Sequence, residues 1–307
     1  MIAEIFSLYQ KYKQTTKLRE KRIADKIGVS EGMLLVARMR HDVLYLNNQY
    51  LQDILKHTVS LGRLLCVLRN NACISEAIDS FNFTLQDGNL CNLHTQRFSL
   101  HLNTHPDLHV FAIHNYEEKK FSLQICDPYG YLITKLHLQQ QKTVSDFVQF
   151  TQGLQTKLPN NIFTHSECQA FDYNHYIQNY SYINSLGDIA ELVTKNKINL
   201  AHTPCSAREE SSYQDMVTII KRTASIDNLL LAAVANSTAV QVHIGSINNL
   251  SSTNDCFNIV DDNFHLHMYN QVAVVYKIVL NLKACKITVL QSFDVHKQPI
   301  LLLASLE

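Results

Sequence analysis

The chain has 307 residues, no formal net charge, 46% hydrophobic residues and 18% charged residues. This composition is typical of a folded globular protein and excludes a largely disordered chain. A neutral chain also has no global field that would attract it to nucleic acid or to an anionic membrane. The eight cysteines form no Cys-x-x-Cys pair, which argues against a zinc ribbon or a disulfide framework and favours reduced thiols in a cytoplasmic protein. We expect neither a signal peptide nor insertion into a membrane.

Residues 2–40 are predicted to be helical because their apolar positions recur at helical spacing. Gly28 is expected to end one helix, and Ser30 to cap the next one, which begins at Glu31. The stretch 23–30, with its basic neighbours, is compatible with a DNA-binding helix-turn-helix. A helical hairpin with a charged, solvated face is the favoured interpretation, because one such unit in a neutral chain would bind DNA poorly.

From residue 43 the pattern changes to short alternating segments, which predict an antiparallel meander. In the first half, strands are expected at 43–46, 63–69, 72–78, 90–93, 98–103, 108–115, 121–126 and 131–138, with helices at 49–57 and 143–156. Turn signals at 117–120 and 127–130 separate consecutive strands. In the second half, a helix is expected at 210–223 and strands at 229–235, 239–246, 256–260, 264–269, 272–281, 286–293 and 299–305.

The two halves share a sequence pattern at an offset of 166 residues, which indicates an internal duplication. The matched pairs are Asn92/Asn258, Leu93/Ile259, Phe98/Phe264, Leu100/Leu266, His101/His267 and Leu102/Met268. Asn70 and Asn236 match at the same offset. The predicted fold is therefore α+β, a tandem repeat of two large antiparallel sheets with helices packed on them. We divide the chain into a helical hairpin at 1–42, a first repeat at 43–157, an inter-repeat segment at 158–208 and a second repeat at 209–307.

The inter-repeat segment contains an aromatic cluster around one histidine, His175. The aromatic residues are Phe171, Tyr173, Tyr176, Tyr180 and Tyr182. Residues 172–184 are predicted to form a helix that Asp172 caps. From spacing alone, core aromatics and a hydrogen-bonded histidine are favoured over a ligand site.

Several of these motifs together resemble the bacterial haemin transport and haemin-degrading family, the HemS/ChuS/PhuS group. They are the hairpin at 23–34, Leu68-Arg-Asn70, Phe98-Ser-Leu-His-Leu102, the stretch 258–267 and the inter-repeat helix. The resemblance implies two similar halves that bind haem b in a cleft between them. It places His175 at the axial iron ligand, and aromatic side chains such as Phe171, Tyr176 and Tyr180 suit the porphyrin face.

His101 stands where the family usually has an arginine. An arginine cannot coordinate iron, whereas a histidine can, so His101 predicts a second metal ligand and a haem held by two histidines. The family's cations for the haem propionates are also absent from the matching stretches, 279–280 and 303–307. This absence predicts weaker haem affinity, or propionates that reach solvent or other cations.

Three functions follow from the resemblance. The first is a cytoplasmic carrier or store that receives haem from an importer and passes it to an acceptor. The alternatives are a haem-degrading enzyme, for which no catalytic side chain is assigned, and a diverged scaffold that has lost haem. Two further histidines, His243 and His265, are interpreted as ordinary strand residues.

Overall fold

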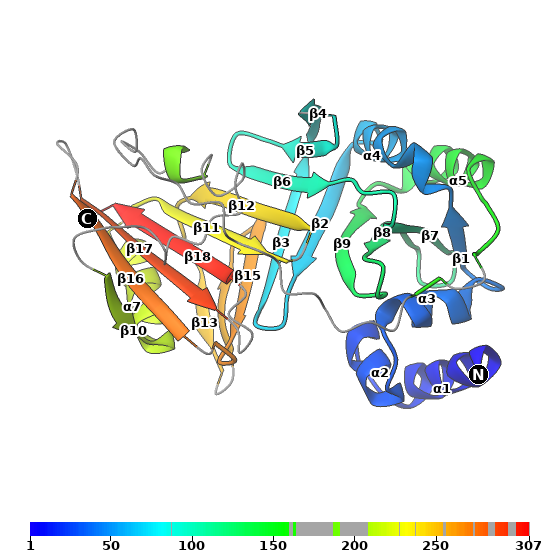
Figure 1. Ribbon diagram of the computed structural model, residues 1–307, viewed down its shortest axis with the longest axis horizontal. Coiled ribbons are helices and arrows are strands. Elements are labelled where there is room, and N and C mark those ends of the chain that lie inside the picture. The colour runs from blue at the N-terminus through cyan, green and yellow to red at the C-terminus, as the bar shows by residue number, and fades with distance from the viewer. Residues whose placement is uncertain are drawn as a thin grey trace.

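The structure is a computed structural model that describes residues 1–86, 88–159, 162–163, 187–190, 208–226, 228–236, 238–253, 256–272, 274–281, 286–293 and 299–306. Two nine-stranded antiparallel sheets form its framework (Figure 1). The first sheet has the order β1 (Val43–Leu46), β7 (His109–Asn115), β8 (Lys120–Cys126), β9 (Leu132–Leu138), β2 (Arg63–Arg69), β3 (Cys73–Ser80), β15 (Phe264–Tyr269), β14 (Cys256–Val260) and β13 (Leu250–Ser252). The second has the order β10 (Arg208–Ser211), β16 (Val274–Asn281), β17 (Lys286–Phe293), β18 (Pro299–Leu306), β11 (Leu230–Ala235), β12 (Ala239–Gly245), β6 (Phe98–Asn103), β5 (Leu90–His94) and β4 (Asn82–Gln86).

Each sheet contains strands from both repeats. Strands β4 to β6 of the first repeat join the second sheet through the pairing of β6 with β12. Strands β13 to β15 of the second repeat join the first sheet through the pairing of β15 with β3. The two joints have the same register, because Leu100 lies opposite Gln241 in one and Leu266 lies opposite Ser75 in the other. The α+β tandem-repeat prediction is confirmed, and the repeats are interleaved.

The two sheets pack against each other, and we call the faces in contact the inner faces and the opposite ones the outer faces. Alternation along β6 places Leu100 and Leu102 in the inner core, where both are fully buried. The remaining inner surface is covered by α4 (Leu51–Ser60), α5 (Val144–Gly153) and α7 (Tyr213–Ser225), with the short 3-10 turns Asn48–Tyr50 and Gln141–Thr143 before α4 and α5.

The N-terminal helices are α1 (Ile2–Thr15), α2 (Glu20–Ile27) and α3 (Glu31–Arg38). Gly28 ends α2 with φ +79°, and the Ser30 hydroxyl accepts a hydrogen bond from the Met33 amide at 3.2 Å, as the sequence predicts. Helix α3 packs on the outer face of the first sheet, and seven of its eight residues are buried. A DNA-recognition helix needs an exposed face for the major groove, so α3 does not fit that role.

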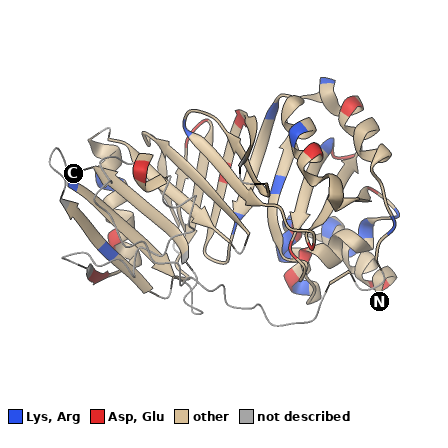
Figure 2. Ribbon diagram, turned by 45° about the horizontal axis from the view of Figure 1, so that its top comes forward, with Lys and Arg blue, Asp and Glu red and all other residues tan. Residues whose placement is uncertain are grey.

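Charged residues gather at the end of the molecule that holds these helices, whereas the strands of the second sheet are mostly uncharged (Figure 2). Arg38 is 2% exposed and pairs with Glu20 and Asp42, each at 2.5 Å. Lys135 of β9 pairs with the same Glu20 at 3.1 Å. Burial alone would raise the pKa of the Glu20 carboxyl, but Lys135 and Arg38 hold it below its usual range. These ion pairs attach the helices to the first sheet.

The predicted helices and strands of the described ranges are present, with ends shifted by up to about three residues. Strands β4, β10 and β13 are additional to the prediction. The helix predicted at 172–184 lies outside the described residues. Among the described helices, none is long and apolar enough to cross a membrane.

Candidate functional site

His101 projects from β6 onto the outer face of the second sheet, because its neighbours Leu100 and Leu102 point into the inner core. Its register partners are Val240 of β12 and Asn92 of β5. From β12 onward this outer face carries a continuous group of apolar side chains, which we call the apolar outer face; Tyr276 and Gln291 are polar neighbours on the same side. The apolar outer face consists of Leu231, Ala233, Val240, Val242, Ile278, Ile287, Val289, Leu302 and Ala304.

Part of the inter-repeat segment packs on the apolar outer face. Ile189 is fully buried against it, and Ala190 is partly buried beside Ile189. This contact places residues 189–190 of the inter-repeat segment on the same side of the second sheet as His101. A flat apolar ligand bound against the second sheet on this side would therefore contact the aliphatic side chains of the apolar outer face.

The imidazole of His101 is half-buried, and its buried Nδ1 atom has no hydrogen-bond partner among the described residues. The same is true of Oδ1 of Asn92, its register partner. Burial, with a smaller contribution from His94, lowers the pKa of His101 to about 4, so the ring is neutral at pH 7. A neutral imidazole with an unpaired nitrogen is the form that coordinates a metal ion.

In the second repeat, the residues that match His101 and Asn92 are hydrogen-bonded to each other. His267 Nδ1 lies 2.7 Å from Oδ1 of Asn258, and these residues match His101 and Asn92. A buried polar atom left unpaired costs about 1–3 kcal/mol. The first repeat carries this cost at His101, which is typical of a position that a ligand completes.

The other predicted site residues lie outside the described residues. They are Phe171, His175, Tyr176 and Tyr180, so the predicted pairing of His101 with His175 stays a prediction. The stretches predicted to lack propionate-binding cations are partly described: Leu280 packs against the apolar outer face, to which Ala304 belongs.

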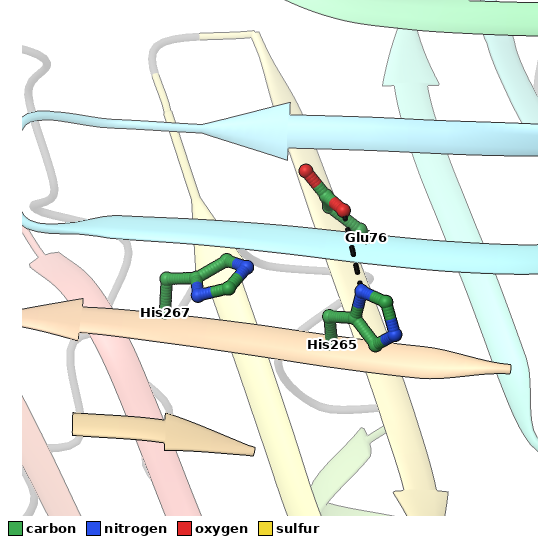
Figure 3. Close-up of side chains that lie close together, drawn as sticks. All are labelled: Glu76, His265 and His267. Atoms are coloured by element: carbon green, nitrogen blue, oxygen red, sulfur yellow. Dashed lines mark ion pairs between the residues drawn. The ribbon is translucent and has the colours of Figure 1, made fainter. Parts of the chain in front are cut away.

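A cluster that the sequence interpretation missed lies on the outer face of the first sheet. It joins Glu76 of β3 with His265 and His267 of β15 (Figure 3). His265 was interpreted as an ordinary strand residue, and His267 was matched only to its repeat partner. The usable signal is the spacing His-x-His, because alternate residues of a strand project from the same face.

A cavity of about 630 Å³ lies elsewhere, beside the β7–β8 turn and α5. Its lining includes Tyr116, Phe121, Val144 and Val148. It contains no histidine, cysteine or acidic side chain and none of the predicted site residues. We therefore place the candidate site on the second sheet and not in this cavity.

Comparison with known proteins gives one family match. The model of the haemin-degrading HemS.ChuX domain matches residues 28–154 and 196–303. Together these ranges cover both repeats and more than half of the chain. No curated protein matches this sequence.

Solved structures share the fold over nearly the whole chain. Holo-PhuS, a heme-binding protein from Pseudomonas aeruginosa, is 20% identical with a TM-score of 0.82, over 99% of this chain and 93% of that one. ChuS, a heme-degrading enzyme from Escherichia coli O157:H7, is 17% identical with a TM-score of 0.80, over 99% and 94% of the two chains. At these identities the comparisons establish the two-repeat architecture.

Proposed function

Because the chain belongs to the haemin-degrading HemS.ChuX domain family, we propose that it binds haem b against the apolar outer face of the second sheet. The observation that carries this proposal is the neutral, half-buried imidazole of His101 at the edge of that face, whose buried Nδ1 has no hydrogen-bond partner among the described residues. The names of two proteins with the same fold, a heme-binding and a heme-degrading protein, support it.

In this proposal the haem lies between the second sheet and the inter-repeat segment. His101 of β6 and His175 of the inter-repeat segment would hold the haem iron. Phe171, Tyr176 and Tyr180 would contact the porphyrin beside His175. Bound haem supplies an iron centre with two axial positions, and imidazole nitrogen is a normal ligand at each of them.

The apolar outer face has consequences for the propionates. A carboxylate placed among aliphatic side chains without a partner would lose its hydration at a cost of several kcal/mol. The propionates would therefore avoid the aliphatic part of this face and reach solvent, cations elsewhere or polar side chains beside it, such as Tyr276 and Gln291. Each charge-assisted hydrogen bond that is not made leaves haem binding about 1.5–3 kcal/mol weaker.

We favour a carrier or store in the cytoplasm, which receives haem from an importer and passes it on. Haem iron held by two imidazoles would have no open coordination position for oxygen. The family description and the name of ChuS favour the alternative, a haem-degrading enzyme. A scaffold without haem is the third candidate, and one titration separates all three.

The full chain is titrated with ferric haem while the Soret band is followed, and the complex is then exposed to a reductant and oxygen. The carrier predicts a low-spin spectrum that persists, and His101→Ala and His175→Ala each convert it to high spin. His105→Ala is the matched control, because His105 is exposed and pairs only with Asp107 at 3.1 Å.

Each alternative has its own outcome in this titration. A high-spin, water-bound parent complex would contradict ligation by His101. Loss of the Soret band with release of a bile pigment would select the degrading enzyme. Failure of the parent chain to bind haem would select the diverged scaffold.

A further inference from the structure

Three metal-binding side chains converge on the outer face of the first sheet. His265 of β15 lies directly opposite Glu76 of β3, and His267 follows two residues later on the same strand. Each offers one ligand atom, and these three atoms all lie within 4.8 Å of one another. Figure 3 shows both imidazoles and the carboxylate on the same side of the sheet.

The tautomer of His267 is set by its neighbour Asn258. Oδ1 of Asn258 lies 2.7 Å from Nδ1 of His267, and an amide oxygen can only accept a hydrogen bond. The Nδ1 atom therefore carries the proton, which leaves the lone pair of Nε2 available. Metal-binding histidines are commonly oriented in this way, with the second ring nitrogen donating to a fixed oxygen.

The other two side chains are held together less tightly. Nδ1 of His265 lies 3.4 Å from the Glu76 carboxylate, and the side chains are 30% and 17% exposed. Arg19, from the α1–α2 connection, lies 3.9 Å from the same carboxylate, but its side chain is 79% exposed. Among the described residues, a metal ion at the cluster would displace Arg19 from the Glu76 carboxylate. The Arg19–Glu76 ion pair is long and solvated, so it contributes little to stability.

The duplicated fold has two equivalent positions for this cluster, one in each sheet, and the three ligand side chains occur together at one of them. At the repeat offset of 166, Glu76 corresponds to Val242 and His265 to Ser99, and Val242 pairs with Ser99 in the same register. Only His267 has a metal-binding counterpart, His101. Duplication therefore accounts for a histidine at position 267, but it does not account for Glu76 and His265, which complete the three-ligand cluster.

We propose that Glu76, His265 and His267 bind a divalent first-row transition metal ion, such as zinc, at a site separate from the haem site. Two imidazoles and one carboxylate are a recurrent ligand set for zinc and for non-haem ferrous iron, whereas magnesium and calcium prefer oxygen ligands. Ligand atoms about 2.1 Å from zinc are about 3.4 Å apart, so these partly exposed side chains close inward by roughly 1 Å. Three protein ligands leave at least one coordination position for water.

Cobalt(II) tests this site because its visible absorption reports the number and type of ligands. Full-length, haem-free protein is treated with a chelator, dialysed and titrated with Co²⁺, and Zn²⁺ is then added in competition. We expect one equivalent of Co²⁺ to bind with absorption bands of a four- or five-coordinate ion, and Zn²⁺ to displace it.

Variants assign the binding to these residues. Glu76→Gln, which keeps the shape of the side chain, and His267→Ala should each weaken Zn²⁺ binding about tenfold or more. His105→Ala should leave it unchanged, and circular dichroism of every variant verifies folding. Absence of the Co²⁺ bands in the parent protein would overturn the proposal. Unchanged Zn²⁺ affinity in a folded Glu76→Gln/His267→Ala variant would overturn it as well.

Discussion

Asn70 and Asn236 make matching pairs of hydrogen bonds across the junction of the two repeats. Nδ2 of Asn70 donates to the carbonyls of Ala235 at 2.8 Å and Ile300 at 2.7 Å. Nδ2 of Asn236 donates to two carbonyls of the first repeat, at 3.3 and 2.9 Å. Each amide oxygen also accepts from backbone amides of its own turn. The two asparagines therefore tie each repeat to the other.

Replacing either asparagine should destabilise the whole molecule. Asn70→Ala leaves two partly buried carbonyls and two turn amides without partners, and we expect a loss of about 1–3 kcal/mol in the free energy of unfolding. Asn236→Ala should cost a similar amount because its bonds match. Urea denaturation measures both losses, with Asn270→Ala as control, because Asn270 is exposed. Losses as small as that of the control would show that these bonds do not hold the repeats together.

Ser75 and Gln241 form a second symmetric contact, between the inner faces of the two sheets. Nε2 of Gln241 donates to the Ser75 hydroxyl at 2.9 Å, and both side chains are buried. Ser75→Ala leaves the amide unpaired and should cost about 1–3 kcal/mol, whereas Ser75→Ala combined with Gln241→Leu removes both partners. In a double-mutant cycle measured by urea denaturation, we expect the double variant to lose at least about 0.5 kcal/mol less than the sum of the single losses. Additive losses would contradict the contact.

Most of the fold could be predicted because buried strands have strong alternation and repeated motifs. The three strands that escaped prediction, β4, β10 and β13, all lie at the ends of the sheets. An edge strand buries little, so its apolar pattern is weak, as the exposed Leu85 of β4 illustrates. The exchange of strands between the sheets could not be predicted from the sequence either. Alternation shows which side chains of a strand are buried, but it does not show which other strand pairs with it.

The candidate sites show a similar division. His101 could be singled out because it breaks a family pattern, and its outward orientation follows from alternation along β6. The cluster of Glu76 with His265 could not be found, since it depends on the pairing of strands from different repeats. Glu76 and His265, 189 positions apart in the chain, become neighbours only once β15 joins β3. The His-x-His spacing marks two histidines on one face of a strand, but it does not identify Glu76 as their neighbour.

The buried His243 should make stability fall at acid pH. It stacks on Phe264 with ring centroids 3.8 Å apart, and burial, assisted by Arg97, lowers its pKa from 6.5 to about 4. Between these values the unfolded chain binds a proton that the folded chain does not, so unfolding becomes easier as pH falls, by up to about 3 kcal/mol in total.

His243→Gln removes this titrating group, so the loss of stability between pH 6.5 and 4 should become smaller. Urea denaturation at a series of pH values measures the change. The same substitution at an exposed histidine, His105→Gln, serves as control. An identical pH dependence in His243→Gln and the parent protein would mean that His243 titrates normally in the folded state.

Replacing His101 by arginine tests whether His101 is an iron ligand. An arginine cannot coordinate iron, so in His101→Arg the ferric haem complex should become high spin. His101→Gln is the matched control: it removes the imidazole without adding charge and should also give a high-spin complex. Since the pKa of His101 is about 4, protonation of His101 should not by itself convert the parent complex to high spin between pH 6.5 and about 4. Absorption spectra recorded across this pH range measure both effects, and a low-spin His101→Arg complex would place the second iron ligand on another residue.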